Sequence, residues 1–551
     1  MTIRAFRWAS DRIKEKGIVA FITNGGWLRS NTGEGIRRSF AGEFNDIYVY
    51  DLRGLRGDRG GTKEEGGNIF GIGTAVAITF LVKNPDSSHK GQIHYISTPD
   101  SASRDAKLRL LEGAAKSEPE WESLTMDSFG DWLDLRDASF YSLIPTGLKK
   151  KSTKIPGIFD IWSAGVKTGK DPYLYSFSEE DLLDNVQTFE EFFNEELEKW
   201  NEWTANGGRG KAEEVAKNVV RQDPTKIKWG YEIYQLLDRV SSPLKLDSSY
   251  IRTTLWRPFT KKYLYFYRPL IQIAYLQPSL FPEADSKNLE ICVAGVGSHS
   301  FSCLMANVLP DLDLIPHSQC FPLYRYQKDR FGVGEYERRS AITDQALKMF
   351  REVYGGLLDF DPDKAKEQIF YYIYGLLHSK EYREKYQDTL SKDLPRIPFS
   401  SYFKEFEKAG RELAAFHVGY EKAPKNEDVV PPVGEPVGEI SKMRLDKEHG
   451  TLTVNRYLSF ENIPQEAFQY VVNGRSPLEW VVDQYKVKTD KDSGIVSDPN
   501  DSPISDIDYV ADLIPRLVTV SVRTQEIVDS LPSIDRLTSM DSEIERIWGA
   551  K

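Results

Sequence analysis

The chain has 551 residues, of which 40% are hydrophobic, 12% aromatic and 28% charged, and its formal net charge is −11. This aromatic content excludes a largely disordered chain, and the length is enough for roughly two to four domains with their own cores. The acidic balance excludes a protein that coats nucleic acid over its whole surface, although it leaves room for a local basic cleft.

The sequence predicts no membrane span and no signal peptide. Its longest uncharged apolar stretch, residues 69–82, is rich in glycine and shorter than the roughly 20 residues that a span needs. Charged residues are spread through the N-terminal segment, where a signal peptide has an apolar core. We therefore expect a cytoplasmic protein that does not contact a membrane.

The three cysteines, Cys292, Cys303 and Cys320, cannot all pair, and none of them has close C-x-x-C spacing. This pattern is typical of a reducing compartment and indicates neither a disulfide framework nor a common zinc site. His299 and His317 also lack the spacing of metal ligands, so structural roles are favoured. We expect no bound metal.

The first ninety residues predict alternating helices and strands. A surface helix over residues 2–16 ends at Gly17, a residue that suits a helix C-cap. Residues 18–23 form a continuous apolar run, which is typical of a buried parallel strand. A capped helix is expected over 34–44, and further strands over 47–52 and 75–83. This order predicts the end of an open α/β sheet.

A locally basic segment follows an acidic one. Between Arg209 and Arg268 there are thirteen lysines and arginines against six acidic residues, whereas residues 179–202 are strongly acidic. Aromatic and basic residues interleave over 250–268, and their alternation over 262–268 predicts a strand with one aromatic face. The segment is either a DNA contact, with cations placed for phosphates, or a half-buried strand with solvated charges.

Three places in the sequence are candidates for DNA contact. The first is the Gly-rich loop after strand 47–52, at a strand's carboxyl end. The second is the basic turn at 167–170, for which the alternative is a plain surface turn. The third is the basic and aromatic segment. The candidate DNA-binding residues are Arg53, Arg56, Arg59, Lys63, Lys167, Thr168, Lys170, Arg252, Arg257, Lys261, Lys262 and Arg268.

The C-terminal part predicts mainly helices. A linker rich in proline, glutamate and lysine covers residues 421–439, and a hairpin over 443–455 turns at 448–450. Helices are expected around 465–472, 477–485 and 507–531.

Short strings along the whole chain occur in an ordered set. They lie at residues 17–28 (GIVAFITNGGWL), 35–38, 49–54, 68–71, 75–83, 166–171, 256–259, 261–266, 318–324, 370–379, 394–399 and 485–496. In this order the strings resemble the type ISP restriction-modification enzymes, from the second half of their methyltransferase domain onward. Those enzymes join a nuclease, a helicase-like translocase, an N6-adenine methyltransferase and a C-terminal target recognition domain in one chain.

The resemblance implies a fold and a set of domains. The fold class is α/β: the C-terminal part of an open methyltransferase-like sheet, followed by an α+β target recognition domain and a mostly helical C-terminal region. The implied parts are the methyltransferase part (1–90), a connecting segment (91–150), the target recognition domain (151–420), a linker (421–441) and the C-terminal specificity or scaffold region (442–551).

The resemblance also implies a reaction whose main motif this sequence lacks. Family methyltransferases flip an adenine out of the duplex, stack it on the aromatic ring of an Asn-Pro-Pro-Tyr type motif, and methylate it with S-adenosylmethionine. The nearest strings here, residues 171–173 and 498–500, lack the second proline. We therefore expect no catalytic residue, no cofactor-binding residue and no binding of S-adenosylmethionine by this chain alone.

The expected function is DNA target recognition for a site-specific adenine-N6 DNA methyltransferase, with double-stranded DNA as partner and no activity from this chain alone. If the chain is truncated, strand 18–23 should present an unpaired apolar edge. One alternative is the second half of a split enzyme, whose separate partner chain carries the missing methyltransferase half. Another is a non-catalytic protein-interaction module, which the acidic net charge favours.

Overall fold

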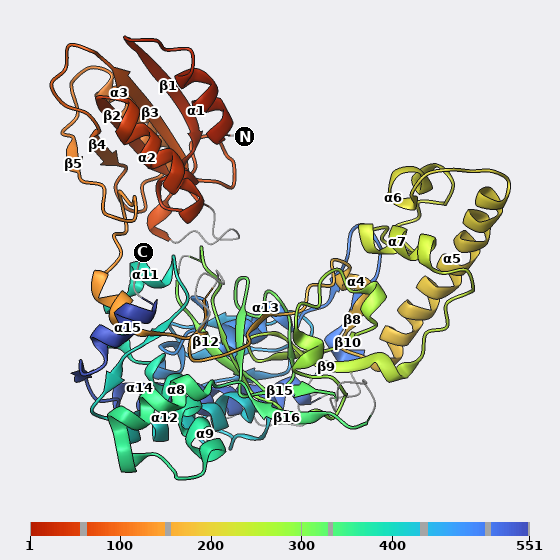
Figure 1. The fold of residues 1–551 in the computed structure, drawn as a ribbon. Helices are drawn as coiled ribbons and strands as arrows, with labels where there is room; N and C mark the ends of the chain where they lie inside the picture. Colours follow the sequence, from red (N-terminus) through yellow and green to blue (C-terminus); the bar gives the residue numbers. More distant parts are fainter. Residues whose placement is uncertain are drawn as a thin grey trace. The chain divides into compact units, whose positions relative to one another are not determined.

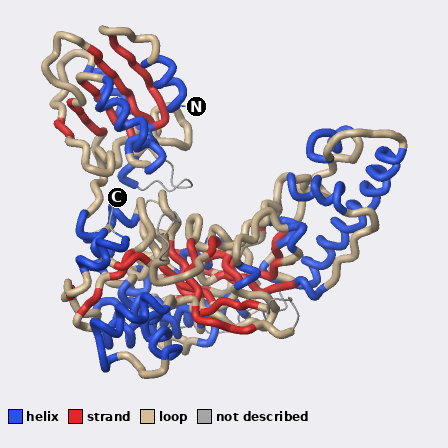
Figure 2. The backbone as a smooth tube through the Cα atoms, in the orientation of Figure 1, coloured by secondary structure: helices blue, strands red, loops and turns tan. Residues whose placement is uncertain are grey.

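The computed structural model describes residues 2–55, 63–148, 156–298, 300–328, 334–429, 439–501 and 508–548. The chain forms two compact units. Unit 1 comprises Met1–Tyr141, Val296–His299 and Lys385–Asp393, and unit 2 comprises Ser142–Gly295, Ser300–Glu384 and Leu394–Lys551. Both units mix helices with strands (Figure 2). Over the described ranges, every helix is too short or too polar to span a membrane.

Unit 1 is built on a five-stranded sheet with the order β1-β3-β2-β4-β5. Strand β3 runs antiparallel to both β1 and β2, β2 is parallel to β4, and β5 is antiparallel to β4 (Figure 1). The strands are β1 (Gly17–Asn24), β2 (Asp46–Arg53), β3 (Val76–Lys83), β4 (Gln92–Ser97) and β5 (Glu122–Leu124), and the helices are α1 (Thr2–Ser10), α2 (Glu34–Glu43), α3 (Arg104–Ala114) and α11 (Gln387–Leu390).

Apolar side chains cover both faces of this sheet. On one face, Phe6 of α1 and Phe40 of α2 pack with Val49 of β2 in one core cluster. On the other, Leu111 of α3 packs against the cluster that contains Tyr50. Since successive residues of a strand point to opposite faces, β2 is buried from both sides, as in α/β proteins.

Strand β1 differs from its prediction as a buried parallel strand. Its partner β3 is antiparallel, with Ala20 opposite Phe80, and it has no second neighbour among the described strands. Ile18 is 65% exposed and Ile22 58% exposed. The interpretation as a buried parallel strand is wrong, because β1 lies at the edge of the sheet and alternate residues along it, including Ile18 and Ile22, face solvent. The expected unpaired apolar edge is present in the described chain.

Other predicted elements of unit 1 fall close to the observed ones. The predictions over 34–44, 47–52 and 75–83 are confirmed by α2, β2 and β3. The first helix ends at Ser10 rather than at residue 16. The sheet continues past residue 90 through β4 and β5, so the segment predicted as a connection supplies two strands.

A buried carboxylate, Asp131, links three segments of unit 1 through ion pairs. Asp131 contacts three cations: Arg37 at 2.9 Å, Arg136 at 3.1 Å and Lys392 at 3.0 Å. Arg37 is itself buried and also donates to the carbonyl oxygens of Trp27 and Gly130. This network joins α2 to the loop around residue 130 and to the segment at 385–393.

Unit 2 contains two four-stranded sheets, with orders β13-β9-β10-β8 and β12-β11-β14-β7. Their strands are β7 (Ser163–Ala164), β8 (Tyr175–Ser176), β9 (Ile251–Arg257), β10 (Thr260–Tyr265), β11 (Glu290–Val293), β12 (Cys303–Ala306), β13 (Leu309–Pro310) and β14 (Gln319–Pro322). The short strands are β6 (Ile144–Pro145) with β17 (Arg396–Ile397), β15 (Tyr324–Gln327) with β16 (Glu337–Ser340), β18 (Phe399–Ser400) with β24 (Arg536–Leu537), β19 (Arg444–Asp446) with β20 (Thr451–Thr453) and β21 (Ser459–Phe460), and β22 (Lys488–Thr489) with β23 (Val496–Ser497).

A helical arm is inserted between β8 and β9. It contains α5 (Glu179–Ala205), α6 (Ala212–Val215) and α7 (Tyr231–Arg239), and α4 (Asp171–Leu174) precedes β8 (Figure 1). Ser178 caps α5 by accepting a hydrogen bond from the Asp181 amide, and acidic residues fill its first turn. The buried face of α5 recurs at helical spacing through Leu182, Val186, Phe189, Phe193, Leu197 and Trp200.

The C-terminal part of unit 2 is mainly helical. Helices α8, α9, α12 and α14 group together (Figure 1). Close approach of α9 and α12 needs Gly375 and Gly410, because a Cβ atom at either would collide with the facing helix backbone. The remaining bounds are α8 (Asp344–Tyr354), α9 (Pro362–Leu376), α10 (Lys380–Lys385), α12 (Phe403–Val418), α13 (Pro477–Gln484), α14 (Tyr509–Asp529) and α15 (Asp541–Trp548).

The hairpin predicted over 443–455 is confirmed by β19 and β20, and α13 and α14 confirm the helices at 477–485 and 507–531. The helix expected over 465–472 is instead a 3-10 turn over Gln465–Phe468. Part of the predicted linker, residues 430–438, lies outside the described residues.

Candidate nucleic-acid interface

Two cations of the β9–β10 hairpin lie near three cations that flank or follow α13. We call Arg257, Lys262, Arg475, Lys486 and Lys488 the basic cluster. Burial, Lys488 and Arg257 lower the pKa of Lys262 against the effect of Asp171. Partial desolvation by its neighbours, with Lys486, Arg257 and Arg475, lowers the pKa of Lys488 against the effect of Asp483. Because like charges depress one another's protonation only at close range, these shifts place the five groups in one electrostatic neighbourhood.

Lys262 is the most buried cation of the basic cluster, with 9% of its surface exposed. Its ammonium lies 3.0 Å from the hydroxyl oxygen of Ser497 and 4.2 Å from the ring centre of Phe177. Burial, with repulsion from Lys488 and Arg257, lowers its pKa to about 7. Within the described ranges it has no ion pair with a carboxylate. Asp171 favours the charged form without pairing with Lys262, and a bound anion would favour that form further.

Arg257 is held in place by its own neighbours. Its Nη1 donates to Asp311 Oδ1 over 2.7 Å, and the guanidinium lies 3.9 Å from the ring centre of Trp256. Tyr175 donates its hydroxyl proton to the other oxygen of Asp311 over 2.9 Å. Burial raises the pKa of Asp311 to about 6, although Arg257 opposes the shift. The arginine is therefore fixed in orientation at the end of β9.

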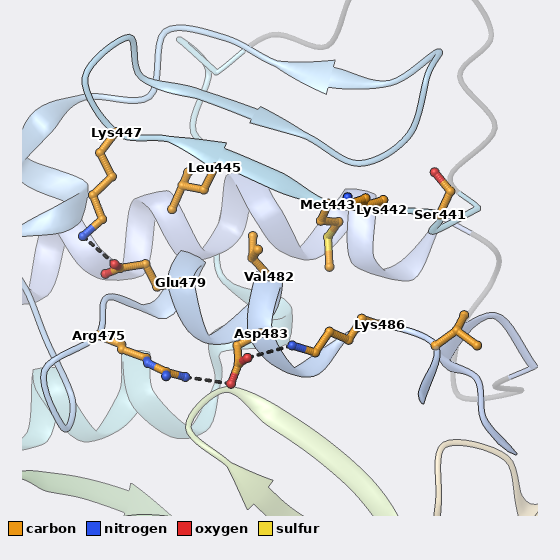
Figure 3. Close-up of a pocket in the computed structure, with 11 residues that line it drawn as sticks. Ser441, Lys442, Met443, Leu445, Lys447, Arg475, Glu479, Val482, Asp483 and Lys486 are labelled. Atoms are coloured by element: carbon orange, nitrogen blue, oxygen red, sulfur yellow. Dashed lines mark hydrogen bonds and ion pairs between the residues drawn. The ribbon is translucent and has the colours of Figure 1, made fainter. Parts of the chain in front are cut away.

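A groove with a volume of about 630 Å³ adjoins the basic cluster (Figure 3). One wall is β19 with the residues before it, where Met443 and Leu445 point inward, and the other is α13. Asp483 of α13 bridges Arg475 at 2.7 Å and Lys486 at 2.9 Å. Met443 and Leu445 therefore line an apolar part of the groove, and Arg475 and Lys486 of the basic cluster line its edge.

Helix α13 connects the groove to the hairpin. The indole nitrogen of Trp256 donates to Gln484 Oε1 over 3.3 Å. At the other end of α13, Ser476 and Glu479 form a reciprocal capping box, which fixes where the helix begins. Arg475 and Lys486 flank α13, and the contacts of this helix fix their backbone positions.

Three predicted residues of the hairpin segment make contacts within the chain. The Lys261 ammonium pairs with Glu421 at 2.5 Å, so its charge is already neutralised. Arg252 donates to the carbonyl oxygens of Ser249 and Ile251. Arg268 is exposed and donates to the Ile271 carbonyl oxygen. The predicted aromatic strand over 262–268 ends at Tyr265.

The basic turn at 167–170 is mostly interior. The fully buried Lys170 ammonium is held by Glu232 of α7 and by the Leu270 carbonyl oxygen. Thr168 is also buried and donates to Asp171. These positions argue against the predicted phosphate contacts of Lys170 and Thr168, because both polar groups are satisfied inside the fold. Lys167 is exposed, and its contact with DNA stays a prediction.

The candidate loop of unit 1 is only partly described. Arg53, with a backbone φ of 51°, pairs with Asp100 at the end of β2. Arg56 and Arg59 lie outside the described residues, and so does the side chain of Lys63. Their contact with DNA stays a prediction.

Sequence reasoning missed Arg475, Lys486 and Lys488 as members of this site. Lys486 and Lys488 lie in one of the family-like strings, at 485–496, but more than two hundred residues separate them from Lys262. Only the contacts of α13 and β23 with the hairpin bring them together.

Comparison with known proteins gives one family. Residues 157–513 match the family model described as the Type ISP C-terminal specificity domain. A nuclease-deletion mutant of the Type ISP enzyme LlaGI, solved in complex with a DNA substrate mimic, is 32% identical with a TM-score of 0.85. The match covers 97% of this chain and 48% of that one. No curated protein matched the sequence.

Two further solved structures agree. The ATP-dependent Type ISP enzyme LlaBIII bound to DNA is 33% identical with a TM-score of 0.85, covering 97% of this chain and 34% of that one. A cryoEM structure of a DrdV–DNA complex is 30% identical with a TM-score of 0.79, covering 97% and 52%. The chain thus spans about half, or less, of these relatives. The family model and these structures together show that the chain belongs to the Type ISP restriction-modification family.

Proposed function

We propose that this chain recognises target DNA for a site-specific adenine-N6 DNA methyltransferase of a restriction-modification system. The observation that carries the proposal is the basic cluster, in which Lys262 is nearly buried beside other cations and lacks a carboxylate partner in the described chain. The LlaGI structure holds a DNA substrate mimic and the LlaBIII and DrdV structures hold DNA, which supports the same role here.

Within this proposal the cations divide by exposure. Lys488 is exposed, while Arg475 and Lys486 have nearly half of their side-chain surface in solvent and share the single carboxylate of Asp483. The three cations therefore keep a net positive charge with which to contact phosphates. Arg257 and Lys262 lie deeper and strengthen the local positive potential. Phosphate contacts position the protein, and base edges are then read by side chains that reach a groove of the duplex.

A salt titration tests this function. Fluorescence anisotropy with a labelled duplex should give an affinity that falls with salt, with a log–log slope of about −0.9 per neutralised phosphate. Lys488→Met should reduce the slope by about 0.9, whereas the control Lys261→Met should leave it unchanged because Lys261 is paired with Glu421. A wild-type chain that does not bind duplex DNA would instead support the protein-interaction alternative.

We further propose that unit 1 is the C-terminal part of a methyltransferase sheet, and that it does not catalyse methyl transfer alone. No Asn-Pro-Pro-Tyr type motif occurs in the 551 residues. In this proposal the binding site for S-adenosylmethionine and the Asn-Pro-Pro-Tyr type motif belong to the part of the family enzymes that this chain does not span. A labelled methyl-transfer assay on duplex DNA, in which this chain by itself incorporates methyl groups, would refute it.

The edge of β1 favours a second candidate, half of a split enzyme. Exposed Ile18 and Ile22 lie beside the free hydrogen-bonding edge of β1, and such edges recruit another strand. A separate methyltransferase half added to this chain should then restore methyl transfer, and Ile22→Lys should abolish the restoration. Ile3→Lys, at an exposed position of α1, is the matched control.

A further inference from the structure

A buried group of metal-ligating side chains lies in the second sheet of unit 2, away from the basic cluster. Glu290 and Cys292 are two residues apart on β11 and so share one face of the sheet. Cys320 of β14 lies directly opposite Cys292 in the strand pairing. All three are fully buried, and one ligand atom from each lies within 4.8 Å of the others.

Two oxygen atoms at this group have no hydrogen-bond partner. They are Oε1 of Glu290 and Oε1 of Gln277, which lies in a 3-10 turn over Gln277–Ser279. The Gln277 amide nitrogen donates to the other oxygen of Glu290 over 3.2 Å, so the two side chains are adjacent. Buried polar atoms in native proteins nearly always have a partner, so these two acceptors are open to a donor or a cation.

The two sulfur atoms have weak contacts, and the Cys320 thiol also interacts with the Cys292 thiol and the Glu290 carboxyl group. Cys292 Sγ lies 3.8 Å from the Glu290 carbonyl oxygen, and Cys320 Sγ lies 3.9 Å from the Ser318 hydroxyl oxygen. The described residues supply no lysine or arginine to pair with Glu290. The group therefore combines two thiols, one carboxylate and an adjacent amide side chain, and no lysine or arginine of the described chain pairs with them.

We propose that Glu290, Cys292 and Cys320 bind one zinc ion, with Gln277 Oε1 as the fourth ligand. Zinc in structural sites takes four ligands, and thiolates favour it over magnesium or calcium. Binding converts both thiols to thiolates, and their protons leave to solvent. Burial raises the pKa of Glu290 to about 8, so near neutral pH its proton also leaves when the ion binds, and the site with two thiolates, one carboxylate and Zn²⁺ carries a net charge of −1.

The site is structural and not catalytic, because a catalytic zinc keeps one position open to water or substrate and all four ligand residues here are fully buried. The ion would tie β11, β14 and the turn at 277–279 together. Cys292 and Cys320 also belong to the core cluster that includes residues of α13 and α14. Zinc would thereby stiffen the sheet on which the C-terminal helices pack.

Metal analysis of the full chain tests the proposal. Protein purified from zinc-supplemented cells without chelator should contain about one zinc per chain by mass spectrometry. Cys292→Ser and Cys320→Ser should lose it. Cys303→Ser is the matched control, because Cys303 is equally buried and lies opposite Val293 on the other side of β11.

A second measurement needs no variant. After zinc is replaced by Co²⁺, the wild-type chain should show the charge-transfer absorption of thiolate-bound cobalt. Zinc-free protein that takes up no cobalt would overturn the proposal, and so would zinc retained in both serine variants. A count of one free thiol under denaturing, non-reducing conditions would identify a Cys292–Cys320 disulfide instead and also refute it.

Discussion

The ammonium of Lys262 on β10 and the hydroxyl of Ser497 on β23 meet at 3.0 Å across 235 residues of sequence. This contact places a nearly buried cation beneath the exposed strand β22 and its Lys488. The basic cluster thus has an outer part that reaches solvent, with Lys488, and an inner part, with Lys262, that is nearly buried.

DNA affinity should depend on pH through Lys262. A phosphate bound at Lys488 offsets the repulsion between Lys488 and Lys262 and raises the Lys262 pKa from about 7, so binding takes up a proton. The affinity should therefore fall as pH rises through and above about 7. Lys262→Met should flatten this dependence in anisotropy titrations at fixed salt, while Lys261→Met retains it. Equal pH dependence in all three proteins would exclude Lys262 as its source.

Lys262 should also lower the stability of the free protein near neutral pH. Its folded pKa of about 7 is below its ordinary value of 10.5, so between these values the unfolded chain binds more protons and stability rises with pH. Below about pH 7 the full destabilisation is present. Lys262→Met should raise the free energy of unfolding by on the order of a few kcal/mol there, with a smaller gain towards about pH 10. Urea unfolding at several pH values measures both, and a destabilised variant at every pH would contradict the argument.

Arg37 should be essential to unit 1. Arg37→Met leaves the buried Asp131 carboxylate with two cations in place of three and removes donors to two carbonyl oxygens. We expect a loss of about 3–5 kcal/mol, measured by thermal or urea unfolding. Arg38→Met on the same helix should cost less than about 1 kcal/mol, since Arg38 forms an exposed ion pair with Glu34.

Two glycine-to-alanine substitutions should have opposite signs. Gly410→Ala places a methyl group against the α9 backbone and should destabilise the protein by about 1–3 kcal/mol. Gly42→Ala, in an exposed position of α2 with open space around it, should stabilise it by about 0.5–1 kcal/mol. Differential scanning calorimetry of the two variants distinguishes them, and a Gly410→Ala variant as stable as the wild type would refute the close packing of α9 and α12.

Much of the local structure could be predicted from the sequence, because it depends on nearby residues. The amphipathic spacing in α2, the apolar alternation in β2 and the Gly450 turn between β19 and β20 are all local signals. Strand partners are not local. The pairing of β1 with an antiparallel β3 depends on residues more than fifty positions away, so an apolar run alone could not reveal it.

The same limit applies to the candidate site. Lys170 resembles a free surface cation until Glu232, 62 residues later, comes to lie against it. Cys292 and Cys320 lack any close sequence motif, yet strand pairing makes them neighbours. Lys488 has no signal of its own beyond a family-like string. In each case a long-range contact decides whether a charged or reactive side chain is satisfied or available.

The two ends of the helical arm return to one sheet, where Ser176 of β8 is paired with Tyr263 of β10. The arm is thus a nested insertion whose entry strand β8 and exit strand β9 flank β10 in this sheet. Recombination between related genes at these two strands could replace the whole arm while the anchoring sheet keeps its register.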